Sequence, residues 1–256
     1  MININVDDVY KLERFRKRLF WSPQHTLYKV CNFESDYNNI PSRVEFLQYV
    51  ASLKNVPNLV LPIDLLKDSD IFGYEIPYVD NSTNINEYLY QEVKDIDIKR
   101  VIISLFDSLQ EIHKYFIFND IHNGNILIKD DHVLFVDWDL GIKLDSLEIP
   151  PTCYSIYELA SKPTQLEDIT KALICALCIY YKTDIEIYIE SMGIRSLLNF
   201  LISIKANKEI INCISLIISA YKHNQTTIDF DFSEMFESIS LPSKKEVRKI
   251  RKRINY

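Results

Sequence analysis

Hydrophobic positions recur with helical spacing in the middle of the chain, over residues 95–116. The apolar residues of this segment follow one another at intervals of three and four: Ile102, Leu105, Leu109, Ile112 and Phe116. Side chains at this spacing share one face of an α-helix. The pattern therefore predicts an amphipathic helix that buries one side.

The first third of the chain carries shorter apolar runs that are typical of strands. Three such runs cover residues 26–33, 58–66 and 71–79. They are rich in β-branched and aromatic residues, which favour strands. Between the first two, the segment 42–54 has the spacing of a helix that is entered through Pro41 and Ser42.

A strand hairpin follows the central helix, and helical patterns dominate after it. Residues 126–136 predict two strands that turn at Asp130 and Asp131. Beyond about residue 165 the apolar spacing is mainly helical, while the polar run 78–84 suits a hinge. A strand-rich first third thus meets a helix-rich remainder, which predicts an α+β fold.

Composition places the chain among soluble globular proteins. The 256 residues are 47% hydrophobic and 25% charged, with five cysteines at irregular spacing. An odd cysteine count without a regular pattern favours a reducing, cytoplasmic compartment, and the start lacks the features of a secretory signal. The apolar run 172–181 is too short to span a bilayer. Cys175 and Cys178 lie inside it, so core packing is favoured over metal or redox chemistry.

The net charge of −7 is unevenly distributed. Residues 244–253 hold seven basic side chains and one acid, a formal +6, which leaves −13 for the rest of the chain. Such a tail suits an acidic partner, nucleic acid or a membrane surface. The alternative is a solvated C-terminal helix that begins with a capping box of Ser243 and Glu246.

Polar residues gather on both sides of the predicted hairpin. Asp120 and Asn125 lie just before it, and Asp137 lies just after it. A hairpin brings its two ends together, so we expect the three side chains to converge. Carboxylate and amide oxygens suit Mg²⁺, which usually keeps substrate phosphates as further ligands. A carboxylate beside the metal can accept a proton from an attacking hydroxyl.

The segment "EIHKYFIFNDIHNGNILIKDDHVLFVDWDLG" (111–141) resembles the catalytic core of the protein kinase-like superfamily. Asp120 and Asn125 match the D-x-x-x-x-N of its catalytic loop, and Asp137 matches the Asp of its D-F-G. The resemblance implies that Asp120 is the catalytic base. It implies that Asn125 and Asp137 are ligands of Mg²⁺ or Mn²⁺ and that ATP is the phosphate donor.

The resemblance extends upstream to the nucleotide-binding strand. In "TLYKV", Lys29 resembles the lysine that binds the nucleotide phosphates, and Glu45 on the next helix would be its ion-pair partner. A second role is open for Glu45, because Ser42 and Glu45 also have the spacing of a capping box. The alternative to the phosphate-binding role is that Lys29 is an ordinary lysine on a strand face.

The stretch "EIPYVDN" (75–81) resembles the linker on which adenine docks through backbone groups. Pro77 offers only a carbonyl, because proline has no N–H. Val79 offers both a carbonyl and an N–H. Ile76 would lie behind the adenine. A simple strand end would have much the same sequence.

Downstream, residues 153–169 resemble the end of a protein kinase activation segment and the helix after it. Glu158 stands where the Glu of A-P-E would be, and Asp168 where an acid supports the catalytic loop from below. Asp168 is equally well explained as a first-turn acid that follows a Thr164 cap. The interval between Asp137 and Glu158 suits an activation segment, which implies a protein substrate.

Several departures from the family pattern are visible. No glycine precedes Gly73, so the segment over the phosphates would offer basic side chains, among them Arg16 and Arg18, instead of backbone N–H groups. Phe118 and Asn119 replace the His-Arg of H-R-D. "DWD" replaces D-F-G, where Trp138 can fill the apolar slot of Phe and Asp139 adds an acid.

His122 is a further departure, since it resembles the aminoglycoside and choline type of phosphotransferase. Its imidazole could bridge to the transferred phosphate when protonated near neutral pH. It could equally pack within the loop.

Taken together, the resemblance implies a bilobal protein kinase-like fold. Its parts would be a β-rich N-lobe (1–79), a helical C-lobe (80–242) and a basic C-terminal tail (243–256). The expected activity is transfer of the γ-phosphate of Mg-ATP to a hydroxyl, foremost Ser or Thr of a protein. Two alternatives are open: a small-molecule phosphotransferase, and a pseudokinase that acts as a binding module.

Overall fold

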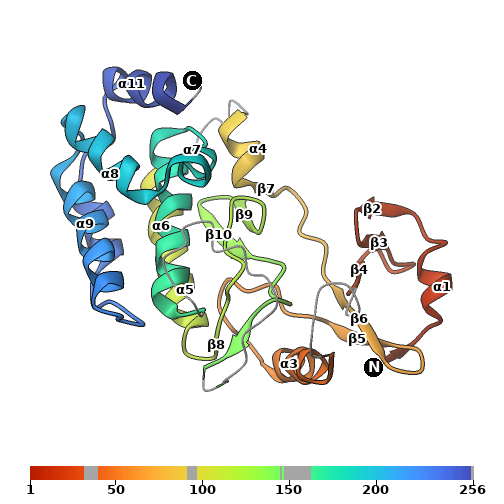
Figure 1. Cartoon of the computed structure of the whole chain (residues 1–256). Coiled ribbons are helices and arrows are strands. Elements are labelled where there is room, and N and C mark those ends of the chain that lie inside the picture. Colours follow the sequence, from red (N-terminus) through yellow and green to blue (C-terminus); the bar gives the residue numbers. More distant parts are fainter. Residues whose placement is uncertain (32–39, 91–96, 145, 147–162, 255–256) are drawn as a thin grey trace.

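The computed structural model describes residues 1–31, 40–90, 97–144, 146 and 163–254 (Figure 1). These residues form a mixed α+β structure, with a six-stranded sheet in the N-terminal part and helices in nearly all of the part beyond residue 163. The α+β class predicted from the hydrophobic pattern is confirmed.

The N-terminal sheet has the strand order β1-β5-β6-β4-β3-β2. Its strands are β1 (Ile2–Asn3), β2 (Arg14–Arg16), β3 (Leu19–Trp21), β4 (Leu27–Val30), β5 (Asp64–Lys67) and β6 (Ile71–Ile76). Strands β1 and β5 pair in parallel, and the other neighbours are antiparallel. The predicted strands at 26–33 and 71–79 contain β4 and β6 and are confirmed, whereas the predicted strand at 58–66 overlaps β5 only from Asp64 to Leu66. The register sets Lys29 opposite both Leu19 and Tyr74.

Helix α3 (Ile40–Ser52) packs against β5. The predicted helix at 42–54 is confirmed, with both ends two residues earlier. Its buried Phe46 meets Phe116 edge-on, with ring centroids 5.5 Å apart. Because the helix already begins at Ile40, Ser42 lies inside it and is not its cap. The capping box proposed for Ser42 and Glu45 is therefore wrong.

The chain leaves the large sheet after Ile76 and enters a second, three-stranded sheet of order β10-β9-β7. These strands are β7 (Thr83–Asn84), β9 (Ile126–Lys129) and β10 (His132–Phe135). Strands β9 and β10 form the predicted hairpin, because Lys129 pairs with His132 across a turn of Asp130 and Asp131. Strands β8 (Phe116–Ile117) and β11 (Ile142–Lys143), one before and one after the hairpin in the chain, pair with each other in a separate two-stranded sheet.

Most of the helices follow β7 in the chain. They are α4 (Ile85–Tyr90), α5 (Ile98–Ile112), α6 (Gln165–Tyr181), α7 (Ile185–Met192), α8 (Ile194–Ser203), α9 (Lys208–Lys222), α10 (Phe232–Ser238) and α11 (Lys244–Ile254), with the short α1 (Val6–Val9) in the N-terminal part. Figure 1 shows α6 beside α5 within this part. Helix α6 is buried along almost its whole length, and its charged residues Glu167, Asp168 and Lys171 are buried as well.

The core of the helical part is aromatic and aliphatic. Phe106 of α5 stacks on Phe232 of α10, with ring centroids 4.6 Å apart. Cys175 and Cys178 are buried free thiols within α6. This agrees with the prediction that they serve core packing. Among the described residues, no helix combines the length and the apolar character needed to cross a bilayer.

The basic C-terminal segment forms helix α11. Ile250 is buried, while the Lys and Arg side chains of the helix are exposed. Ser243 caps the helix by accepting a hydrogen bond from the N–H of Glu246 at 3.2 Å. The Glu246 carboxylate turns to the Tyr181 hydroxyl at 3.0 Å, so only half of the predicted capping box forms. The binding of an acidic partner or nucleic acid to this helix stays a prediction.

Replacement of Leu105 by Ala tests the α5 core. Leu105 is fully buried, so the substitution removes apolar contacts and leaves a cavity. We expect the free energy of unfolding in urea to fall by about 2–5 kcal/mol. Leu216→Ala on α9 is the matched control, because Leu216 is 41% exposed, and its effect should stay within about 0.5 kcal/mol. Equal losses for the two variants would contradict this core assignment.

Candidate active site

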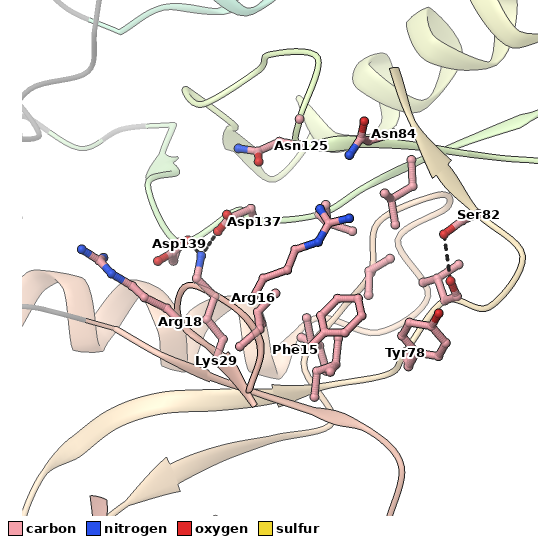
Figure 2. Close-up of a pocket in the computed structure, with 18 of the residues that line it drawn as sticks. Phe15, Arg16, Arg18, Lys29, Tyr78, Ser82, Asn84, Asn125, Asp137 and Asp139 are labelled. Atoms are coloured by element: carbon pink, nitrogen blue, oxygen red, sulfur yellow. Dashed lines mark hydrogen bonds and ion pairs between the residues drawn. The ribbon is translucent and has the colours of Figure 1, made fainter. Parts of the chain in front are cut away.

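A cavity of about 900 Å³ lies between the six-stranded sheet and the loop that precedes β9 (Figure 2). This volume is typical of sites for small molecules and cofactors. Nine of the residues predicted from the sequence line it: Arg16, Arg18, Lys29, Ile76, Pro77, Val79, Asp120, Asn125 and Asp137. The fold thus brings together residues that are far apart in the sequence. Of the other candidates, His122, Glu45 and Asp168 do not line the cavity, and Glu158 lies outside the described residues.

Lys29 is the buried cation of this cavity, with only 9% of its surface exposed. Its Nζ bonds to Asp137 Oδ1 and, at 2.8 Å, to Asp139 Oδ1. Figure 2 shows the side chain directed from β4 toward both carboxylates. A buried ammonium must be paired with opposite charge, or burial would be costly. Lys29 is therefore tied to the segment after the hairpin, and it is not an ordinary lysine on a strand face.

The predicted ion pair between Lys29 and Glu45 is not formed. Glu45 is exposed and pairs with Lys143, at 2.8 Å between Oε1 and Nζ. The hydrogen bond and charge of Lys143 lower the pKa of the Glu45 carboxyl. Lys29 instead takes its carboxylates from the "DWD" segment. The prediction is wrong because Asp139 is buried next to Lys29, whereas Glu45 faces solvent.

Asp120 and Asn125 meet within the loop, as their spacing predicts. The Asn125 amide donates from Nδ2 to the Asp120 carbonyl at 3.0 Å and to Asp120 Oδ2 at 2.9 Å. The Asn125 carbonyl accepts from the N–H of Val136 at 3.0 Å, which ties the loop to the far end of the hairpin. The Asn125 side-chain amide thus orients the Asp120 carboxylate, and the bond from Val136 holds the Asn125 backbone.

His122 packs within the loop beside Asp120. Its Nδ1 accepts from the N–H of Gly124 at 3.0 Å, and its Nε2 lies 3.9 Å from Asp120 Oδ2. Burial lowers the pKa of His122, more than the Asp120 carboxylate raises it, and Lys171 lowers it further. The geometry and the lowered pKa favour a neutral imidazole. The expectation of a protonated His122 near neutral pH is therefore disfavoured.

Asp168 supports the loop from below, out of the first turn of α6. Its carboxylate accepts the N–H of Phe118 at 2.7 Å and the N–H of Asn119 at 2.8 Å, and it lies 3.0 Å from His113 Nε2. The side chain is fully buried. Lys171, one turn further along α6, donates to the Asn119 carbonyl at 2.7 Å. This geometry fits the supporting role predicted for Asp168. Asp168 also lies in the first turn of α6 after the Thr164 cap, as the alternative explanation predicts.

Trp138 fixes the segment that carries the two acids. The indole is fully buried, stacks on Tyr74 with ring centroids 4.6 Å apart, and donates from Nε1 to the Val60 carbonyl at 2.9 Å. Asp137, just before it, has a φ of 67°, in the left-handed region. Asp139, just after it, is 7% exposed. The Trp anchor thus presents both carboxylates to Lys29.

Three basic residues from the end of β2 and the following turn, Arg16, Lys17 and Arg18, line the same cavity. Arg16 pairs with Glu87 of α4, at 3.1 Å between Nη2 and Oε1. Its side chain is directed into the cavity, as Figure 2 shows, and is about half exposed. Arg18 also lines the cavity. No pattern in the sequence predicts the partner Glu87, because it lies on a helix far from Arg16 in the chain.

The other end of the cavity is apolar. Phe15 and Tyr78 line it, and both rings pack against Trp21, with ring centroids 4.9–5.7 Å apart among the three. Pro77 and Val79 of the linker lie at the same end (Figure 2 labels Phe15 and Tyr78). Sequence reasoning missed this aromatic group, because its members come from two strands and the linker. The cavity is thus apolar at one end and charged at the other.

The cavity offers oxygen donors to a divalent cation, although no acidic cluster holds one alone. Within the described residues, no three His, Cys, Asp or Glu side chains are grouped so that they could bind a metal ion. The cavity nevertheless contains the Asp137 carboxylate and the Asn125 amide. Hard oxygens of this kind suit Mg²⁺ when a ligand with phosphates supplies further donors. The donor chemistry therefore fits the predicted metal.

Comparison with known proteins does not assign the chain to a family. No family model matches it, and no curated protein sequence matches it.

Glu186 lies against the loop from the first turn of α7. Its Oε2 accepts from the N–H of Asn123 at 3.4 Å. Burial raises the pKa of Glu186 from its usual 4.5 to about 7, and the nearby acids Asp184, Glu190 and Asp120 add to the rise. The folded protein therefore retains a proton on Glu186 over a range in which the unfolded chain loses it.

Glu186→Gln should stabilise the fold at high pH only. Between about pH 4.5 and 7 the folded state binds more protons at this site, so the free energy of unfolding falls as pH rises. We expect the variant to exceed the unaltered protein by roughly 1–3 kcal/mol at pH 8 and to match it near pH 4. Urea unfolding at both pH values measures the difference. A difference that does not change with pH would contradict the assignment.

Proposed function

We propose that the protein is a phosphotransferase with a bilobal, protein kinase-like arrangement, which transfers the γ-phosphate of ATP to a hydroxyl group. One observation carries the proposal. Lys29, Asp120, Asn125 and Asp137 line a single cavity, although they come from a strand, a loop and the segment after a hairpin. The position of each matches the role that the family resemblance implies.

The polarity of the cavity supports a nucleotide as the ligand. A flat base would lie at the apolar end, between the aromatic rings and the linker, where the Pro77 carbonyl and the backbone of Val79 offer hydrogen bonds. The phosphates would lie toward Lys29. Arg16 and Arg18 would take the place of a glycine-rich loop, with charged side chains instead of backbone N–H groups.

Asn125 and Asp137 would hold Mg²⁺, or Mn²⁺ in its place. When bound, the ion would neutralise charge on the phosphates. Asp137 is bonded to Lys29 in the structure, so it must exchange part of this contact when it binds metal. Lys29 keeps a second carboxylate partner, Asp139, during such an exchange.

Asp120 would accept the proton of the attacking hydroxyl. The Asn125 amide holds Asp120 Oδ2 at 2.9 Å, which leaves Oδ1 for the substrate. The two backbone bonds to Asp168 fix the loop at Phe118 and Asn119. Because phosphoryl transfer depends on positioning and electrostatics, a rigid loop of this kind supports catalysis.

The acceptor is proposed to be Ser or Thr of a protein. Support comes from the length of the segment between Asp137 and Glu158, most of which lies outside the described residues. His122 is engaged within the loop by the N–H of Gly124 and does not line the cavity, which weakens the case for a small-molecule enzyme that uses this imidazole to hold phosphate.

A pseudokinase is the second candidate. The observation that favours it is the bond between Lys29 and Asp137, which engages the metal-binding acid in the structure. Such a protein would bind ATP, or a partner, without transferring phosphate. It differs from the first candidate only in turnover, so a transfer assay separates the two.

Asp120→Asn should abolish most phosphate transfer while it leaves ATP binding intact. Loss of a general base typically costs about 10²- to 10⁴-fold in rate. Transfer is measured with γ-labelled ATP and Mg²⁺, and label is followed on the protein itself, on a protein mixture and in the small-molecule fraction. Asp130→Asn is the matched control, because Asp130 is exposed at the hairpin turn with a φ of 53°, which Asn tolerates.

The position of the label decides between the candidates. Label on protein supports the proposed function, and label in a small product supports the small-molecule enzyme. ATP binding without transfer by the unaltered chain would favour the pseudokinase. Transfer by Asp120→Asn at the rate of the unaltered protein would contradict the role of Asp120.

A further inference from the structure

The second acid of the "DWD" segment contacts Lys29 directly. Asp139 Oδ1 lies 2.8 Å from Lys29 Nζ, and its Oδ2 accepts from the Cys31 thiol at 3.7 Å. Burial raises the pKa of Cys31 well above its usual value, so the thiol remains a donor. Asp139 itself is 7% exposed. Both of its oxygens thus have partners on or next to β4.

The backbone on both sides of Asp139 is held by the rest of the structure. Trp138 is locked by its stacking on Tyr74 and its bond to Val60. On the other side, Asn119 Nδ2 donates to the Leu140 carbonyl at 3.0 Å. Arg43 of α3 donates to the Gly141 carbonyl at 2.8 Å. Asp139 is therefore a fixed acid, supported from the core, the loop and α3.

Gly141 marks how closely this segment packs. A Cβ at Gly141 would lie 2.5 Å from the Phe46 ring, so no side chain fits there without a shift. Glu45, one residue before Phe46, points away into solvent toward Lys143. Helix α3 thus packs against the segment that carries Asp139 but does not supply the acid that pairs with Lys29.

We propose that Asp139 is the positioning residue that holds the Lys29 ammonium for the nucleotide phosphates, in place of an acid on α3. The inference rests on the proposed function of the cavity. Lys29 shares its charge between Asp137 and Asp139. When Asp137 binds metal, Asp139 keeps Lys29 in place. The position of the Lys29 ammonium is then determined by the segment that carries Asp139 and does not depend on Glu45.

Loss of Asp139 has a definite consequence in this account. Lys29 would be left with Asp137 as its main carboxylate partner, and the ammonium would compete with Mg²⁺ for that carboxylate. ATP binding would then weaken, and more Mg²⁺ would be needed to restore it. Loss of Glu45 would have neither effect, because the Glu45 carboxylate lies outside the cavity and contacts Lys143.

The test measures the Kd for ATP by calorimetry at several Mg²⁺ concentrations, with the melting temperature as a check on folding. Asp139→Asn should raise the Kd about tenfold, because the amide oxygen can still accept from Lys29 but no longer carries the negative charge that pairs with the ammonium. It should also shift half-saturation to higher Mg²⁺. Glu45→Gln is the control and should change the Kd by less than about twofold. If Asp139→Asn folds poorly, Asp139→Ser removes the charge without added bulk and gives the same comparison.

A double-mutant cycle separates positioning from general structural damage. In a Lys29→Met background, Asp139→Asn should have little further effect on the Kd, because the group it positions is gone. An equal loss in both backgrounds would overturn the inference, as would an effect of Glu45→Gln larger than that of Asp139→Asn.

The inference and the proposed function fail in different ways. If the unaltered chain binds ATP without transferring phosphate, the proposed function fails, while the Kd values still decide the role of Asp139. If it does not bind ATP at all, both fail. If ATP binds and phosphate is transferred but Asp139→Asn behaves as the unaltered protein, the inference alone is overturned.

Discussion

The buried ammonium of Lys29 is the constraint on which the rest of the site depends. A charge in this position must be matched by carboxylates, and both come from the segment that follows the hairpin. The match ties β4 of the large sheet to the chain beyond β10. It also places the two acids at the charged end of a cavity whose other end is aromatic. A ligand with a flat base and a polyanionic tail suits such a cavity.

The loop opposite Lys29 is held by a second set of buried polar contacts. Asp168 and Lys171 of α6 bind the backbone at Phe118 and Asn119, and Asn125 joins Asp120 to the hairpin. These groups are satisfied by one another, which gives the loop one arrangement. Helix α6 is buried on almost every side and so serves as a fixed base for the loop. The polar residues at the start of "NDIHNGN" (119–125) are thus explained by the contacts that hold this loop in place.

The parts of the site that depend on short-range spacing could be predicted from the sequence. Asp120, Asn125 and Asp137 flank one hairpin, so its turn at Asp130 was enough to bring them together. The partner of Lys29 could not be predicted, because Glu45 and Asp139 are both acids and only the packing of α3 and Trp138 decides between them. The aromatic rings and the pair of Arg16 with Glu87 were missed for the same reason. They join segments that only the tertiary fold brings together.

The central claim is that this cavity binds a nucleotide with its phosphates at Lys29. An ATP analogue with a reactive acyl phosphate tests it directly, because it acylates a lysine that lies against the terminal phosphates. Digestion and mass spectrometry then locate the modified residue. The account predicts acylation of Lys29, suppressed by excess Mg-ATP. Acylation spread over the exposed lysines, with Lys29 unmodified and no protection by ATP, would contradict it.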